Sequence, residues 1–411
     1  MPARALPAVR EPEEARALGQ LLSEGLGGGV GLVRDVHRAV ATRTFGLLGL
    51  LGLPARAMHD GISSGAYATV RLATYGSGKL AAAAGVSLLP PERRSLSRTR
   101  GGRLVLGALN GAIGDRLAER ESEAAIAMQL RLYDRDLPTD SAALATAYPH
   151  ATSRLVVFVH GLCETDEAWG PWPGTFGARL REELGYSPLQ VRYNTGLHVS
   201  DNGRALARLI DAAVEAWPVP VEEVVLVGHS MGGLVARAAC HYGEESRCGW
   251  VEPLDAVFCL GSPHLGAPLE QAANVGGWAL ARLPETRPFA NLVNGRSAGI
   301  KDLRFGSCLE EDWCDCDPDE LLTDRCQDVP FCRNATYYFI GATVSRTADS
   351  PLARVVGDLL VLYPSASGHG RKRRIPFEAD CGCHFGGMTH FHLLRHPAVY
   401  EQIRNWLDAA G

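Results

Sequence analysis

The sequence has no long apolar run, no excess of positive charge and no cysteine spacing typical of a zinc site. No stretch approaches the 18 or so apolar residues of a membrane span, and the first 14 residues lack the apolar core of a signal peptide. The net charge of -5 gives no reason to expect a nucleic-acid partner. We therefore expect a cytoplasmic protein without a transmembrane span.

Cysteine is distributed unevenly along the chain. Seven of the 11 cysteines lie after residue 300, and four of these form two Cys-x-Cys pairs at Cys314–Cys316 and Cys381–Cys383. Neither pair has the two-residue gap of common zinc knuckles, and an odd total cannot pair completely within one chain. Free thiols are the favoured state, with one to three disulfides or a metal site as alternatives.

The length of 411 residues suits one large core domain with an added segment. Residues 1–150 show helical spacing interrupted by glycine and carry little chemistry, so we expect a helical segment that packs on the core. Two of its helices are expected at 104–117 and 121–132. Its weakly polar surfaces are an alternative contact for lipid or for a partner protein. Nothing in the sequence indicates the oligomeric state.

Residues 151–411 alternate buried strands with helices at a pace typical of a parallel, doubly wound α/β sheet. Residues 271–335 interrupt this rhythm with a long segment rich in Gly, Pro, Asn and acidic residues, which predicts a lid or cap over the site. The expected strands are Ser153–Val159, Leu189–Asn194, Val224–Val227, Leu254–Leu260 and Thr336–Ala342, and the expected helices include Asn202–Trp217 and Pro397–Ala409.

A Gly-x-Ser-x-Gly corner follows the strand at Val224–Val227. Gly228 and Gly232 flank Ser230, and the residues after Ser230 continue at helical spacing. Such a strand-to-helix corner holds the serine in a strained, exposed conformation, and glycine on both sides lets the neighbouring backbone approach closely. The pattern predicts that Ser230 is a nucleophile, whereas a chance Ser in a Gly-rich turn is the alternative.

A His-Gly pair, His160-Gly161, ends the strand at Ser153–Val159. A tetrahedral intermediate of acyl transfer needs two backbone N–H groups from different loops to bind its negative oxygen. We predict that Leu162 and Met231 supply these two groups. An ordinary turn at the end of a strand is the alternative for His160 and Gly161.

A nucleophilic serine needs a histidine base that is itself oriented by a carboxylate, and in this architecture the chain order is Ser, acid, His. Asp358 is the favoured acid because it lies in a Gly-led turn; Asp349, Glu378 and Asp380 are alternatives. His390 is the favoured base, since it follows two glycines on the loop before the last helix. The competing histidines are His392, the main rival, and His369, His384 and His396.

Four segments together resemble the lipase-like branch of the α/β-hydrolase superfamily, including triacylglycerol-lipase-like proteins and inositol-deacylase-like domains. These segments are Val159–Leu162, Gly228–Gly233, Gly261–Pro268 and Gly387–Leu394. The resemblance covers residues 151–411 and implies an α/β-hydrolase fold. Position by position, it implies Ser230 as nucleophile, Asp358 as acid, His390 as base, Leu162 and Met231 as oxyanion donors, and His160, Gly161, Gly228, His229 and Gly232 as supporting residues.

We therefore expect a serine hydrolase that cleaves lipid or other acyl esters through an acyl-enzyme, without a cofactor or a metal. Its partner is a small-molecule or lipid ester, with peripheral lipid contact as a further option. An acyltransferase or a thioesterase would use the same triad. A non-catalytic binding protein of the same fold is the alternative from another class.

Overall fold

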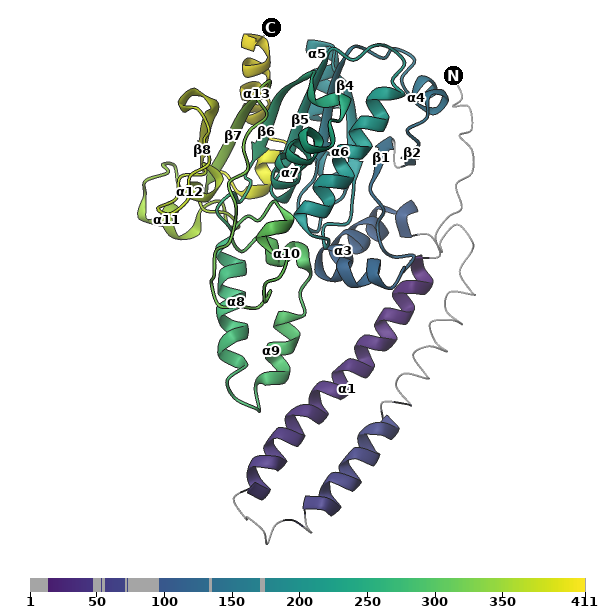
Figure 1. Ribbon diagram of the computed structural model, residues 1–411, viewed down its shortest axis with the longest axis vertical. Helices are drawn as coiled ribbons and strands as arrows, with labels where there is room; N and C mark the ends of the chain where they lie inside the picture. Colours follow the sequence, from purple (N-terminus) through teal and green to yellow (C-terminus); the bar gives the residue numbers. More distant parts are fainter. Residues whose placement is uncertain are drawn as a thin grey trace.

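The computed structural model describes residues 14–46, 53, 56–70, 72, 96–132, 135–170 and 174–410. An eight-stranded sheet with the strand order β2-β1-β4-β3-β5-β6-β7-β8 forms the centre of the molecule (Figure 1). The strands are β1 (Gln129–Leu132), β2 (Arg135–Leu137), β3 (Arg154–Val159), β4 (Ser187–Arg192), β5 (Glu223–His229), β6 (Leu254–Leu260), β7 (Thr336–Thr343) and β8 (Gly382–Gly386).

The sheet is parallel from β4 through β8, and only the β1–β2 and β1–β4 pairs are antiparallel. Its central strands are apolar on both faces, as Val224–Val227 in β5 are fully buried. Strands of this kind need helices on both sides, because neither face can be left in water. The predicted doubly wound α/β sheet is therefore confirmed.

Helices cover the two faces of the sheet. Helices α6 and α7 pack with Leu155 and Val157 of β3 on one face, whereas α5 and α13 pack with Val156 and Phe158 on the other. The helices are α1 (Glu14–Gly46), α3 (Arg100–Glu119), α4 (Ser141–Ala147), α5 (Phe176–Leu184), α6 (Val199–Glu215), α7 (Met231–Ser246), α8 (Pro268–Leu280), α9 (Arg287–Asn294), α10 (Ala298–Asp302), α11 (Pro351–Val356), α12 (Tyr363–Ala366) and α13 (Pro397–Ala410).

The sheet begins earlier in the chain than the sequence indicated. The helix expected over residues 121–132 is wrong: residues 121–128 form turns and irregular backbone, and β1 then pairs with β4 through Gln129–Arg192 and Leu130–Val191. Leu130 enters the core and is 1% exposed, while Arg131 on the opposite face forms ion pairs with Asp136 and Asp166. Backbone pairing with a strand distant in sequence outweighs local helix propensity here. The core thus includes residues before position 150.

Two helical extensions project from the sheet (Figure 1). The first consists of α1 and the helix at 56–70, which lie side by side and are joined by a hydrogen bond of 3.2 Å between His37 Nε2 and His59 Nε2. The second is the α8–α9 hairpin, which lies between β6 and β7 in the chain and belongs to the segment where the sequence predicts a lid. Among the described helices, none has the length and apolar character needed to cross a bilayer. All 11 cysteines lie in described residues, and none forms a disulfide.

The burial of Leu130 in β1 predicts the effect of shortening its side chain. Because this side chain is buried against the sheet, Leu130→Ala should lower the free energy of unfolding by about 2–5 kcal/mol. Chemical denaturation would measure the change. Leu104→Ala is the control, since Leu104 in α3 is 58% exposed and its truncation should cost less than about 1 kcal/mol. Equal effects of the two changes would contradict the inclusion of β1 in the core.

Candidate active site

The chain turns sharply between β5 and α7, and Ser230 is the residue at the corner. Its backbone has φ 53° and ψ −124°, a left-handed conformation that costs energy for any residue with a Cβ. The turn is compact: a Cβ on Gly228 would lie 2.5 Å from the carbonyl group of Gly232, and one on Gly161 would lie 2.9 Å from Ser230 Cβ. Only glycine fits at these positions. The N-terminus of α7 lies directly behind Ser230.

Asp358 and His390 form a buried pair near this corner. His390 Nδ1 donates to Asp358 Oδ2 at 2.7 Å, and the two side chains are 2% and 1% exposed. The other carboxylate oxygen, Oδ1, accepts the N–H groups of Leu360 and Val361 at 3.0 and 2.8 Å. The backbone N–H of His390 also donates to the carbonyl oxygen of Asp358 at 2.9 Å. These contacts fix the imidazole with a proton on Nδ1, so Nε2 is left as a proton acceptor.

The alternative acids lie elsewhere on the molecule. Asp349, Glu378 and Asp380 are exposed, and none of them contacts His390. Asp358 follows the short helix α11 through Gly357, whose φ of 58° turns the chain back toward the site.

The alternative histidines have local partners. His392 is exposed and accepts the N–H of Thr389 at 3.0 Å, so it caps its own 3₁₀ turn. His396 accepts the N–H of Ala398, His384 contacts Thr343, and His369 contacts the Ser367 carbonyl oxygen. His390 is therefore the histidine, among those considered, that meets both a buried carboxylate and the cavity of Ser230.

The predicted oxyanion donors flank Ser230 from two loops. Leu162 follows β3, and Met231 is the first residue of α7. Within the described part of the chain, neither backbone N–H has a hydrogen-bond acceptor. Two unpaired N–H groups beside a half-buried serine are an arrangement that can stabilise a developing oxyanion.

His160 supports the loop after β3. Its ring is fully buried and stacks on Tyr193 with 4.4 Å between ring centroids. Nδ1 donates to the Gly161 carbonyl oxygen at 3.0 Å, Nε2 accepts the N–H of Tyr193, and burial lowers the pKa of the imidazole. His160 is therefore a neutral structural residue.

Glu164 is a site residue that the sequence did not identify. Its Oε2 accepts the N–H of Gly161 at 2.7 Å and faces His229 Nδ1 at 3.1 Å. Burial disfavours its charge, but the positive charge of His229 and these hydrogen bonds outweigh burial and lower the pKa of Glu164 to about 2. Burial also opposes the charge on His229, but Glu164 raises the pKa of His229. The sequence feature that could have identified Glu164 is an acidic residue four positions after His160.

The two acid–histidine pairs are connected. His229 Nε2 donates to the carbonyl oxygen of His390 at 3.3 Å, and the two rings lie 4.7 Å apart between centroids. Since both nitrogens of His229 face acceptors, the geometry favours the imidazolium form. His229 thereby links the loop after β3, through Glu164, to the loop that carries His390.

A cavity of about 220 Å³ opens at Ser230 and His390. Its wall is mostly apolar and includes residues from α8, α10 and the loops around Asp358 and His390. Leu269, Leu360 and Phe391 line it and are 69%, 37% and 59% exposed, so they surround its mouth. An apolar cleft with a few polar groups at one end is typical of a binding site for an organic ligand.

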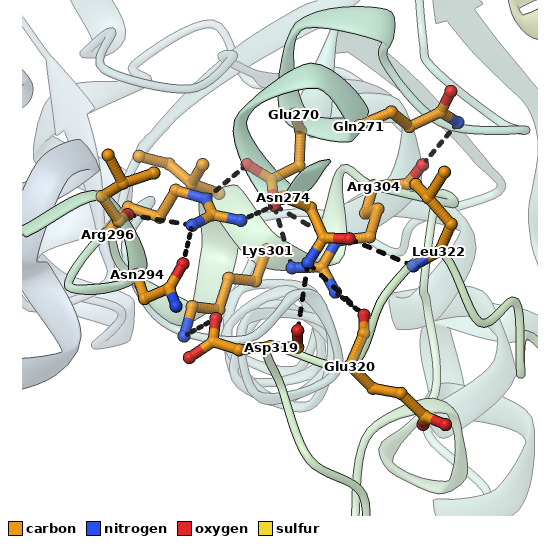
Figure 2. Close-up of polar contacts among 12 residues, drawn as sticks. Glu270, Gln271, Asn274, Asn294, Arg296, Lys301, Arg304, Asp319, Glu320 and Leu322 are labelled. Carbon is orange, nitrogen blue, oxygen red and sulfur yellow. Dashed lines mark hydrogen bonds and ion pairs between the residues drawn. The ribbon is translucent and has the colours of Figure 1, made fainter. Parts of the chain in front are cut away.

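Charged residues join α8 to the chain after α9 at the side of this cavity, within the segment where the sequence predicts a lid. Figure 2 shows the carboxylate of Glu270, from α8, between the guanidinium groups of Arg296 and Arg304. Both Arg296–Glu270 hydrogen bonds measure 2.6 Å, and Arg304 donates to the same carboxylate at 3.1 Å. Glu270 and Arg296 also line the cavity. The ion pairs therefore fix α8 relative to the chain after α9 and form part of the cavity wall.

The Glu164–His229 pair predicts a pH-dependent loss of stability in Glu164→Gln. Without the carboxylate, folding would bury an uncompensated imidazolium, so the variant should lose roughly 3 kcal/mol at about pH 5.5. The pKa of His229 is higher in the folded than in the unfolded parent. The resulting stabilisation is fully present at pH values below the unfolded-state pKa and is lost as the pH rises through the folded-state pKa. The difference should therefore shrink toward about pH 9, and also below about pH 4.

Calorimetric melting temperatures across this pH range would measure the difference. Glu245→Gln is the matched control, because Glu245 is an exposed residue of α7. A constant gap between Glu164→Gln and the parent at all pH values would contradict the pairing with a charged His229.

Part of this chain is similar to a known protein family, and solved structures resemble it at low sequence identity. Residues 193–280 match the model of the PGAP1-like alpha/beta domain, and a search of curated proteins found no match. Among solved structures, the mature lipase BlEst2 of Bacillus licheniformis has 18% identity, covers 62% of this chain and 91% of its own, and has a TM-score of 0.41. A lipase-esterase related protein of Clostridium acetobutylicum has 15% identity, with coverages of 62% and 94% and a TM-score of 0.31.

An esterase of Pyrococcus furiosus has 13% identity, covers 63% of this chain and 82% of its own, and has a TM-score of 0.35. The family match spans the Ser230 corner and the Gly261–Pro268 segment. Over residues 193–280, this match confirms the resemblance to the α/β-hydrolase superfamily that the sequence motifs indicated.

Proposed function

We propose that this protein is a serine hydrolase that cleaves carboxylic esters, of lipid or other acyl groups, through an acyl-enzyme intermediate. The observation that carries the proposal is the hydrogen bonding of the two ring nitrogens of His390. Asp358 holds its Nδ1 at 2.7 Å, whereas Nε2 is buried without a hydrogen-bond partner among the described residues. His390 lines the same cavity as Ser230, which supports a role as general base for the serine hydroxyl.

The reaction follows from these positions. His390 Nε2 takes the Ser230 hydroxyl proton while Oγ attacks the ester carbonyl carbon, and the N–H groups of Leu162 and Met231 bind the oxygen that becomes negative. Collapse of the tetrahedral intermediate breaks the bond to the alcohol, which leaves with the proton from His390. Water then attacks the acyl-enzyme and gives a proton to His390. Collapse of the second tetrahedral intermediate breaks the bond to Ser230 Oγ, which takes this proton back from His390 as the acid leaves. Asp358 stabilises the imidazolium in both halves of the reaction.

The cavity supports an ester with an apolar acyl chain. Its lining includes Pro263, Ala267, Leu269, Ile300 and Leu303 beside Ser230, and burial of each methylene of a bound chain contributes about 0.8 kcal/mol. We therefore expect the acyl part to lie in this cleft. A panel of nitrophenyl esters of increasing chain length would test this directly, since activity independent of chain length would contradict acyl binding in the cavity.

Ser230→Ala should abolish ester hydrolysis, with kcat lowered at least about 10⁴-fold, because no other group replaces the nucleophile. The parent should also react with a fluorophosphonate probe at Ser230, which peptide mass spectrometry would locate. Ser246→Ala, at an exposed residue of α7, is the control and should retain parent activity and labelling. A folded parent that neither labels nor hydrolyses esters would instead favour a non-catalytic binding protein.

Asp358→Asn should lower kcat by about 10⁴-fold at neutral pH with little change in fold, since an amide can hold the imidazole in the wrong tautomer. Steady-state kinetics with a short-chain ester would measure the loss. Asp349→Asn provides the matched control, because Asp349 is exposed and should leave kcat near the parent value. The acid assignment would be overturned if Asp349→Asn, and not Asp358→Asn, lost activity.

A further inference from the structure

Helix α3 presents a face of three glycines to the core. Gly107, Gly111 and Gly114 are spaced four and three residues apart, so they share one side of the helix, and all three are buried. Glycine weakens a helix interior relative to alanine, because its backbone loses more freedom on folding. Three glycines on one face therefore indicate that another part of the backbone must approach this helix closely.

The segment that approaches is the oxyanion loop, defined here as residues 161–165. A Cβ on Gly107 would lie 2.9 Å from the Cys163 carbonyl oxygen and 3.1 Å from that of Glu164. A Cβ on Gly111 would overlap Cys163 Sγ and lie 3.1 Å from Cys163 Cα. Cβ contacts below 3.0 Å are essentially never seen, so a Cβ on Gly107 would displace the loop backbone. A Cβ on Gly111 would displace the Cys163 side chain and, at 3.1 Å from Cys163 Cα, would shift the loop backbone by a few tenths of an ångström.

The oxyanion loop has little freedom to move without changing shape. Cys163 has a φ of 61°, which is strained for a residue with a Cβ, and its N–H donates to Thr195 Oγ1 at 3.2 Å. The N–H of Glu164 donates to the Gly161 carbonyl oxygen at 3.2 Å and closes a tight turn. Leu162 lies inside that turn. A displacement of Cys163 therefore changes the direction of the Leu162 N–H.

Helix α3 also binds two other segments near the site. The side chain of Asn194, after β4, donates to the Gly114 carbonyl oxygen at 2.8 Å. Ser297, which caps α10 in the predicted lid, donates through its hydroxyl to the Gly111 carbonyl oxygen at 2.6 Å and through its N–H to that of Ala112 at 3.0 Å. These carbonyls are available because the helix backbone departs from helical angles at Ile113, with φ −144° and ψ 23°.

We propose that Gly111 is a positioning residue for the oxyanion donor at Leu162, and that the glycine face of α3 is part of the catalytic unit. The proposal rests on the proposed serine hydrolase function and extends it to a segment outside residues 151–411, where the sequence located the catalytic domain. Gly111 touches no substrate. It acts through Cys163, whose position determines where the Leu162 N–H points.

The test compares three glycine-to-alanine variants of the full chain that differ in how far a Cβ would intrude. Gly101, in the first turn of α3, has no atom within 4 Å of an added Cβ and is the control. Gly107→Ala meets carbonyl oxygens near 3 Å, and Gly111→Ala overlaps a sulfur atom. We expect kcat for a short-chain ester to be unchanged in Gly101→Ala, lower by about 10-fold in Gly107→Ala and by about 100-fold in Gly111→Ala, with KM within about threefold throughout.

A rescue variant separates a direct steric effect from general damage to the fold. Cys163→Ala removes the sulfur that the Gly111 Cβ would overlap, so Gly111→Ala combined with Cys163→Ala should recover at least about 10-fold of the lost kcat relative to Gly111→Ala. A loss confined to kcat, together with this recovery, supports the positioning role. Gly111→Ala with the kcat of Gly101→Ala, or equal loss with and without Cys163, would overturn it.

A second measurement does not depend on ester hydrolysis. Hydrogen exchange by mass spectrometry should show faster exchange in a peptide covering residues 160–166 of Gly111→Ala, with no change in a β5 peptide and no change in Gly101→Ala. Unchanged exchange at 160–166 would overturn the contact between α3 and the oxyanion loop. An inactive parent with the expected exchange pattern would overturn the proposed function, and with it the catalytic part of this inference, while the contact itself would stand.

Discussion

Ser230 occupies a left-handed backbone conformation, and the segments around it are arranged so that this conformation persists. The strain of one such residue is on the order of 1–3 kcal/mol, and it must be offset by the packing of its surroundings. The offset comes from glycine at three close approaches, Gly228, Gly232 and Gly161, and from the hydrogen bond between the Ser230 N–H and the Leu260 carbonyl oxygen at 2.8 Å. Helix α7 can begin at Met231 only because the chain changes direction at Ser230.

Two acid–imidazole pairs of different character lie beside that corner. In the Asp358–His390 pair the imidazole keeps one nitrogen unpaired, whereas in the Glu164–His229 pair both nitrogens have acceptors. Only the first arrangement leaves an imidazole able to take a proton. In the second pair, His229 joins two loops through Glu164 and the carbonyl oxygen of His390, and Glu164 raises the pKa of the His229 imidazole against the effect of burial. Similar residue types thus form one pair with an unpaired imidazole nitrogen and one pair with both nitrogens bonded, according to their partners alone.

The sequence alone predicts the features that depend on residues close together along the chain. The Ser230 corner, the β6 strand at Leu254–Leu260 and helix α13 are local patterns, and their apolar periodicity or glycine spacing predicts them. His390 and Asp358 were reached through chain order and turn residues, and the structure brings these two side chains together. Their catalytic roles stay predictions.

Features that depend on distant contacts were not predictable in this way. Strand β1 has only four residues and is defined by its pairing with β4. Glu164 acquires its low pKa from His229, which lies 65 positions later. In the sequence, the glycines of α3 indicate only a helix of low stability, because the oxyanion loop that packs against them lies about 50 residues later in the chain. In each case a single sequence does not reveal the partner, because the partner is brought close only by the folded sheet.

The antiparallel pairing of β1 and β2 has a consequence for how copies of this protein behave beside one another. Without it, β4 would be the last strand, with unpaired backbone groups that could recruit a strand from a second molecule and start aggregation. Instead the edge is β2, which has three residues, of which Arg135 and Asp136 are charged. So short and charged a strand is a poor template for further pairing. The β1–β2 pair therefore protects this edge of the sheet against pairing with a second molecule, whereas the opposite edge is β8.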